Sequence, residues 1–204
     1  MRQRAKLSCV TSFDIVLGQV EDAAEILALQ SQNHISNLPI ETLPSGFVTT
    51  QLSYDTLAQM CAKQGIWVAR ASNGELVAYA CANSWDFYGE SPFFDTAKAL
   101  LPLDWDGRYV KADNSFQYGP VCVTHSFRGQ GVLGQLVETI KAHNAPRFEF
   151  GITFIDIRNE RSLAAHERKL GFRRLALLPY GDVTYRMLSF PLRNGAQVEG
   201  GLHS

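Results

Sequence analysis

Long apolar runs are missing from this sequence. The longest uncharged apolar run covers residues 76–82, whereas a membrane-spanning helix needs about 20 residues. The first ten residues carry Arg2, Arg4 and Lys6, and no apolar stretch of signal-peptide length follows them. We therefore expect no membrane partner and a cytoplasmic location.

The sequence also lacks an excess of either charge. It holds 19 Lys and Arg residues against 20 Asp and Glu residues, which gives a formal net charge of -1. Such a balance supplies no cationic field for a phosphate backbone, so we exclude nucleic acid as a general partner. With 46% hydrophobic and 19% charged residues over 204 positions, the composition is that of an ordinary globular domain.

Metal-ligand spacings are absent as well. The four cysteines, Cys9, Cys61, Cys81 and Cys122, are widely separated and form no CxxC pair. No histidine lies near them in the spacing of a zinc site. We predict no metal and four reduced thiols, because a cytosolic domain of this size does not need disulfides.

No internal repeat divides the chain, and apolar periodicity predicts one alternating α/β domain at residues 13–190. Polar tails are expected at residues 1–12 and 191–204. Strands are predicted at residues 13–17, 66–70, 75–81, 117–123, 152–157, 172–178 and 183–190. Helices are predicted at residues 21–30, 53–63, 95–101, 131–143 and 160–170.

Turn-forming residues separate these elements. Asn73-Gly74 between two apolar runs is a strong hairpin signal, because both positions favour positive φ. Pro120 cannot donate a hydrogen bond within a strand, which predicts a bulge or a break there. Residues 85–109 are irregular, aromatic and acidic, and loops of that length are usually functional.

Residues 121–134 form the most informative segment, because a strand ends, a glycine-rich turn follows and a helix begins at once. Gly129, Gly131 and Gly134 let the backbone approach a ligand without interference from a Cβ atom. The first N–H groups of the helix have no intrahelical acceptor, and Arg128 adds a charged fork. The segment predicts a phosphate or pyrophosphate cradle; the alternative is a turn that only starts the helix. A P-loop and a GxGxxG fingerprint are excluded by the residues present.

The run Arg128-Gly129-Gln130-Gly131-Val132 resembles the acyl-CoA pyrophosphate loop of the GNAT N-acetyltransferase superfamily. Downstream, Asn159-Glu160-Arg161-Ser162 follows a strand and opens a helix that Leu170-Gly171-Phe172 closes. This order is similar to the second CoA-side motif of the same superfamily. The close resemblance covers residues 117–172.

The resemblance implies a fold, a cosubstrate and a mechanism. The fold would be a mixed central sheet of six to seven strands flanked by helices, with the parallel strands 117–123 and 152–157 splayed apart. Acetyl-CoA would be the cosubstrate, and a primary amine would attack its thioester directly. The residues expected to bind it are Val121, Cys122, Val123, Arg128, Gly129, Gln130, Gly131, Val132, Leu133, Gly134, Asn159 and Ser162, with main-chain groups of Val121 and Val123 pairing with the pantetheine arm.

Two departures from the superfamily pattern stand out. Leu133 occupies a position that is usually Gly or Ala, and the second helix is one residue longer than usual. On that helix His166 shares a face with Leu163 and Leu170, which predicts that its ring points inward. It stands near the point where the superfamily often has a proton-donating tyrosine, so the resemblance implies that His166 protonates the departing sulfur. The alternative is a histidine that only packs between these two leucines.

No general base is evident in the sequence. Asp86, Glu90 and Asp113 border the expected acceptor side but are more typical of solvated loop acids, and Tyr118 either orients the acceptor or packs in the core. Acceptor specificity is expected from residues 37–63 and 85–114. The aromatic residues of the second segment, Trp85, Phe87, Tyr88, Phe93, Phe94 and Trp105, suit a cationic amine unless they only pack the loop.

The function predicted is an acetyltransferase acting on a small-molecule primary amine. Two alternatives stay open: a CoA-binding sensor or interaction module without catalysis, and an acetyltransferase for protein N-termini or lysines. The partner expected is the amine, and a homodimer is left open.

Overall fold

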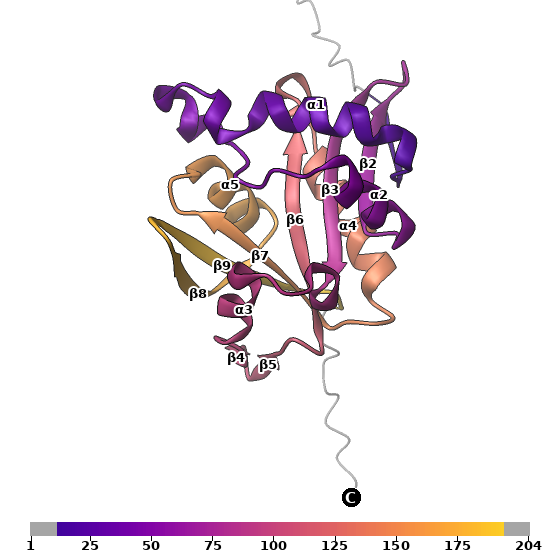
Figure 1. The fold of residues 1–204 in the computed structure, drawn as a ribbon. Helices are drawn as coiled ribbons and strands as arrows, with labels where there is room; N and C mark the ends of the chain where they lie inside the picture. The colour runs from indigo at the N-terminus through magenta and orange to yellow at the C-terminus, as the bar shows by residue number, and fades with distance from the viewer. Residues whose placement is uncertain (1–11, 194–204) are drawn as a thin grey trace, which may run out of the picture.

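The computed structural model describes residues 12–193, so Cys9 and most of both predicted tails lie outside the described residues. A seven-stranded sheet in the order β1-β2-β3-β6-β7-β9-β8 forms its centre (Figure 1). β6 and β7 are its one parallel pair of strands. The strands are β1 Phe13–Leu17, β2 Ile66–Ala71, β3 Leu76–Ser84, β6 Ser115–Val123, β7 Phe150–Asp156, β8 Arg173–Tyr180 and β9 Val183–Pro191. The predicted mixed sheet with flanking helices is confirmed.

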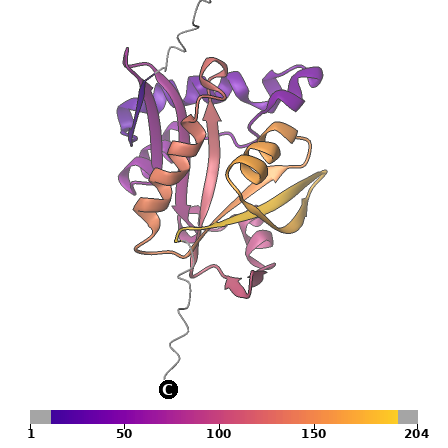
Figure 2. The ribbon, with the colours of Figure 1, turned by 180° about the vertical axis from the view of Figure 1, so that it is seen from behind.

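Helices cover both faces of this sheet. α1 (Ala23–Asn33), α2 (Tyr54–Ala62) and α3 (Pro92–Lys98) lie on one face, whereas α4 (Val132–Asn144) and α5 (Glu160–Ala164) lie on the other (Figures 1 and 2). Three apolar clusters follow from this arrangement: one beneath α4, one beneath α1 and α2, and one between α3 and the β7–β9 end of the sheet. No helix among residues 12–193 is long and apolar enough to cross a membrane.

Local sequence signals account for several element boundaries. Ser53 caps α2 by accepting a hydrogen bond from the Thr56 N–H at 3.1 Å, and Gly74 turns the β2–β3 hairpin with a φ of +86°. The bulge predicted at Pro120 is confirmed. Pairing with β3 passes from Val121 directly to Tyr118 while β3 advances by two residues, so β6 carries one extra residue there.

The segment after β3 is more ordered than predicted. Its helix begins at Pro92 and ends at Lys98, not at 95–101, because proline favours the first helical turn. A two-stranded sheet of β4 (Leu103–Trp105) and β5 (Arg108–Val110) follows and was not predicted. Its turn is Asp106-Gly107, with φ of +59° and +78°, which is itself a hairpin signal in the sequence.

The helix predicted at 160–170 is confirmed in position but not in type. α5 passes into a π-helical turn at Ala165–Lys169, where the Leu170 N–H donates to the Ala165 carbonyl at 3.2 Å. The Phe172 N–H then donates to the His166 carbonyl at 2.9 Å. A π turn takes up an extra residue within a helix, so it accommodates the additional residue noted in the sequence.

The described cysteines support the prediction of reduced thiols. Cys61, Cys81 and Cys122 are free. Cys122 is buried beneath α1 on the face away from α4, as its alternation along the strand predicts. Burial raises the pKa of its thiol to about 12, so it is not a nucleophile at neutral pH.

Candidate active site

The splayed strands open the centre of the sheet. β6 and β7 pair only from Ser115 to Gln117 on β6 and from Phe150 to Ile152 on β7. Past these residues the strands diverge, and Figure 1 shows β7 turning away from β6. The predicted gap between the two strands is therefore present.

A cavity of about 500 Å³ lies over this gap, between the N-terminus of α4 and α5. We call it the α4–α5 cavity. It is lined by Asn33 and by residues from segments 45–48, 121–123, 127–134 and 159–170. Nearly all the residues predicted from the sequence to bind a cosubstrate line it; Gln130 does not.

The glycine turn at its floor has the conformation that the sequence predicts. Gly129 and Gly131 have φ of +81° and +86°, a region that favours glycine. A Cβ atom at either residue would meet nothing within 4 Å, so the space above them is open. Gly131 is the N-cap of α4 and provides no side-chain cap, and the Gln135 N–H donates to its carbonyl at 3.1 Å. The positive end of the α4 dipole therefore faces the cavity.

Arg128 has protein partners that the sequence did not predict. Its Nε donates to the Val123 carbonyl at 3.1 Å, Nη1 to the Ser45 carbonyl at 2.9 Å and Nη2 to Asn33 Oδ1 at 2.8 Å. These hydrogen bonds join β6, α1 and the 45–48 segment. All three acceptors are neutral, so none of them compensates the positive charge of the guanidinium. Burial lowers its pKa, and three of its five N–H donors are used. Its predicted contact with phosphate stays a prediction.

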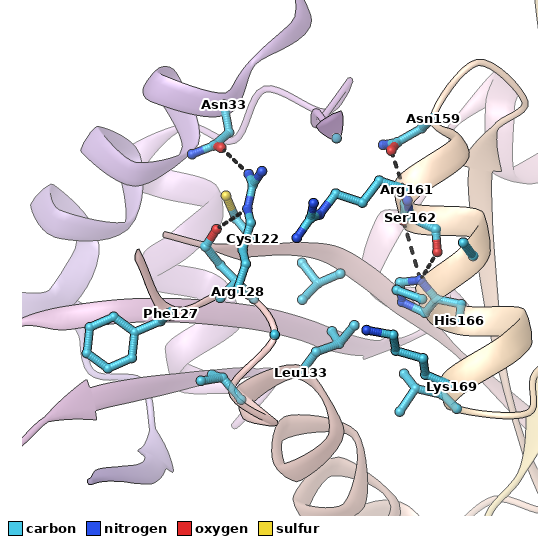
Figure 3. A pocket seen from close by; sticks show the side chains of 18 of the residues that line it. Asn33, Cys122, Phe127, Arg128, Leu133, Asn159, Arg161, Ser162, His166 and Lys169 are labelled. Atoms are coloured by element: carbon cyan, nitrogen blue, oxygen red, sulfur yellow. Dashed lines mark hydrogen bonds between the residues drawn. The ribbon is translucent and has the colours of Figure 1, made fainter. Parts of the chain in front are cut away.

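Two further cations line the cavity and were missed. Arg161 and Lys169 project into it from the α5 side (Figure 3). None of the described residues that line this cavity is Asp or Glu. The cavity thus combines three cationic side chains with a helix N-terminus, which is the donor set that phosphates require. Arg161 lies between Asn159 and Ser162, two residues predicted to bind the cosubstrate, and this position in the motif could have identified it from the sequence.

The main chain of β6 offers fewer free groups than predicted. The Thr124 N–H donates to the Val77 carbonyl at 2.8 Å, so by alternation the main-chain groups of Val121 and Val123 face the gap. However, the Val123 carbonyl already accepts from Arg128. The main-chain groups of Val121 and the N–H of Val123 therefore remain directed at the gap and away from β3.

Asn159 and Ser162 organise the start of α5. Asn159 Oδ1 accepts from the Ser162 N–H at 3.2 Å, and its amide nitrogen donates to the Phe47 carbonyl at 2.7 Å. Asn159 thereby holds the 45–48 segment against α5. Both ends of the Asn159 amide are thus engaged within the protein. Its predicted contact with the cosubstrate stays a prediction.

His166 lies where two cavities meet, since it lines both of them. Its side chain is 2% exposed, and Nδ1 lies 2.8 Å from the Ser162 carbonyl (Figure 3). A carbonyl only accepts, so Nδ1 carries the proton and the neutral ring has a lone pair on Nε2. Burial lowers its pKa to about 4. Nε2 has no hydrogen-bond partner within residues 12–193.

This tautomer changes the chemistry predicted for His166. At neutral pH the ring has no proton on Nε2 to give to a leaving group, whereas it can accept one there. The inward orientation predicted from the helix face is confirmed, and the catalytic role stays a prediction.

The second cavity, of about 440 Å³, lies on the other side of the gap. We call it the aromatic cavity. It shares Phe47, Val48, Val121, Asn159, Ser162 and His166 with the α4–α5 cavity. Its remaining wall comes from segments 49–60 and 88–94, from β6 and β7, and from the β8–β9 hairpin. Residues 45–48, expected on the acceptor side, thus separate the two cavities.

Tyr118 lines the aromatic cavity and carries a second unpaired polar atom. The ring is fully buried among Phe172 and Phe190, with centroids 6.0 and 5.7 Å away. Its hydroxyl has no hydrogen-bond partner among the described residues, and burial raises its pKa. The ring packs in the core, as one interpretation of Tyr118 predicts, and the residue lines the cavity; that Tyr118 orients the acceptor stays a prediction.

The loop acids do not reach either cavity. Asp86, Glu90 and Asp113 line neither of them, and the one acid among the described lining residues is Asp156, which was not predicted. Its carboxylate is held by Arg158, with Nε at 3.0 Å and Nη2 at 2.5 Å. The aromatic cavity therefore carries no uncompensated negative charge.

Residues 33–172 match the acetyltransferase (GNAT) family, and the chain belongs to this family. No curated protein gives a significant match, whereas 427 chains of known structure do.

Three solved structures illustrate the likeness of fold. An N-acetyltransferase from Staphylococcus aureus Mu50 has a TM-score of 0.59 at 17% identity, covering 90% of this chain and 100% of that chain. The structure of yncA from Salmonella typhimurium with its cofactor acetyl-CoA has a TM-score of 0.59 at 15% identity, covering 93% and 99%. The ribosomal-protein-S18-alanine N-acetyltransferase from Escherichia coli has a TM-score of 0.56 at 15% identity, covering 92% and 98%.

Proposed function

We propose that this protein transfers an acetyl group from acetyl-CoA to the primary amine of a small molecule. The observation that carries the proposal is the meeting of two cavities across the β6–β7 gap. One is cationic and lies at a helix N-terminus; the other is aromatic and without net charge. Donor and acceptor would occupy one each, with His166 between them.

The α4–α5 cavity fits the donor substrate. The uncapped N-terminus of α4 and the side chains of Arg161 and Lys169 would hold its phosphates. The main-chain groups of Val121 that face the gap would pair with the amides of its pantetheine arm. Acetyl-CoA, when bound, supplies the thioester that is attacked.

Two unpaired atoms of the chain would handle the protons. A C–N bond forms as the C–S bond breaks, so the amine nitrogen loses one proton and the sulfur gains one. His166 Nε2 accepts the first, because it carries a lone pair. The Tyr118 hydroxyl donates the second, because it has no other acceptor. Return of a proton from His166 to Tyr118 restores both side chains.

The release of free thiol from acetyl-CoA with a panel of primary amines tests this function. We expect turnover with at least one small amine and none with peptides bearing a free N-terminus or lysine. Turnover only with peptides would establish the protein acetyltransferase instead, and absence of both turnover and CoA binding would overturn the assignment.

Leu133 favours one second candidate, a CoA-binding protein without catalysis. Its side chain is half-buried and lines the α4–α5 cavity (Figure 3), where it narrows the approach to the helix N-terminus. Thermal denaturation with CoA separates the two functions. Binding at roughly 100-fold above Kd stabilises a protein by about 2.7 kcal/mol, and such stabilisation without turnover would indicate the non-catalytic protein.

A further inference from the structure

We propose that the acceptor is a monoamine with an aromatic or bulky apolar body and no carboxylate, bound in the aromatic cavity. This inference rests on the function proposed above and names its substrate class. It is carried by the distribution of polar atoms, rings and charges around that cavity.

The polar atoms and the rings lie in different parts of the wall. His166 Nε2 is buried without a partner, and His166 lines both cavities. Tyr118, whose hydroxyl is also buried without a partner, lines the aromatic cavity, and its ring centroid lies 5.8 Å from that of His166. The amine belongs at this end, because burial leaves both atoms in need of a hydrogen bond. A ligand that satisfies them stabilises the complex by more than apolar contact alone.

Aromatic side chains form another part of the wall of the aromatic cavity. Phe93 contacts the rings of Phe154, Tyr180 and Tyr185, each with a centroid distance of 5.2 Å. Phe94 packs on Tyr88 at 4.1 Å. These six rings come from three parts of the chain: α3 with the segment before it, β7, and the β8–β9 hairpin. The three parts converge on one apolar wall.

The charges exclude two common kinds of amine. None of the described residues that line the aromatic cavity is Lys or Arg, so no cationic side chain there would pair with the carboxylate of an amino acid. Asp156 is the one acid in that wall and is already held by Arg158. A second ammonium group, as in a diamine, would therefore find no free carboxylate there, and cation–π contact with the rings would be its only compensation for desolvation.

Matched amines test each part of the inference through kcat/KM for thiol release. We expect 2-phenylethylamine to exceed ethylamine by about 100-fold, from burial of the ring. Phenylalanine, which adds a carboxylate, should fall at least about tenfold below 2-phenylethylamine. The same loss is expected for 1,4-diaminobutane relative to n-butylamine.

Binding without the donor gives an independent readout. Calorimetry should detect 2-phenylethylamine and its N-acetyl derivative, and Phe93→Ala should weaken both by about tenfold. Phe93→Leu keeps an apolar side chain in case the alanine variant unfolds, and Tyr109→Ala, at the exposed residue of β5 and outside both cavities, is the matched control.

The outcomes separate the inference from the proposed function. Turnover of polar amines, diamines or amino acids in preference to 2-phenylethylamine overturns the inference and leaves the acetyltransferase standing. If no amine is turned over, the proposed function fails, and calorimetry decides the inference. Binding of the aryl amine with the expected loss in Phe93→Ala supports it, whereas no binding, or equal binding of ethylamine, overturns it.

Discussion

The buried neutral imidazole of His166 makes a prediction about stability that needs no substrate. Its pKa is about 4 in the folded protein because burial disfavours the charged ring, whereas an exposed histidine has a pKa of 6.5. Between these values the unfolded chain binds a proton that the folded chain does not. The free energy of unfolding therefore falls as pH falls through this window. The stability that depends on the neutral ring is complete only above about pH 6.5.

The size of this loss follows from the two pKa values. At about pH 4.5 the titration of His166 lowers the free energy of unfolding by about 2.5 kcal/mol, and at about pH 7 it lowers it by almost nothing. His166→Gln cannot titrate, so the stability of the wild type relative to this variant should drop by that amount between the two pH values. With a urea slope of about 2 kcal/mol per molar, the difference between the two midpoints should change by roughly 1 M.

Urea denaturation followed by tryptophan fluorescence at both pH values measures the effect. Carboxylates that titrate in the same range cancel, because both proteins contain them. His125→Gln serves as the control, since His125 is exposed in the turn before α4. A wild-type-to-variant difference that stays constant within about 0.5 kcal/mol would refute the neutral buried ring, and with it the Nε2 lone pair on which the proton transfer depends.

Three other substitutions test the two cavities. Arg161→Gln should weaken CoA binding by about three- to tenfold in calorimetry, because one charge-assisted contact is lost, whereas Arg168→Gln on the same helix, outside the cavity, should not. Gly131→Ala should destabilise the fold by about 1 to 2 kcal/mol, because its φ is positive, whereas Gly134→Ala inside α4 should be neutral or stabilising by up to about 1 kcal/mol; equal effects on thermal unfolding would contradict this. Tyr118→Phe should raise the free energy of unfolding by about 1 kcal/mol through loss of an unpaired buried hydroxyl and lower the rate of thiol release at least about tenfold, and an unchanged rate would remove Tyr118 from the proton transfer.

Elements with a strong local signal were predictable from the sequence. The strand at Phe13–Leu17 matches its prediction, and the glycine turn has the backbone that its composition implies. The bulge at Pro120 follows from a missing donor, which is a property of one residue. In each case the decisive physics is local, so a sequence pattern is enough to predict it.

Contacts between distant segments were not predictable in this way. Arg128 meets Asn33 and Ser45, residues 95 and 83 positions away along the chain, and no local pattern encodes that meeting. The π turn was visible only as one extra residue, and the tautomer of His166 depends on where that turn directs the ring. Asp156 was overlooked for a similar reason, because only the splay of β6 from β7 exposes the end of β7 to a cavity.

Seven buried side-chain polar atoms of residues 12–193 lack a partner, and the two that belong to the cavity residues His166 and Tyr118 are informative because of what they cost. A buried donor or acceptor without a partner destabilises a fold by about 1 to 3 kcal/mol, and phenylalanine in place of Tyr118 would avoid that loss without changing the ring packing. His166 nevertheless lines both cavities, and Tyr118 lines the aromatic cavity with its ring centroid 5.8 Å from that of His166. A polar pair at that point is most simply explained if each atom gains its hydrogen bond from a substrate, one from the amine and one from the group that it displaces.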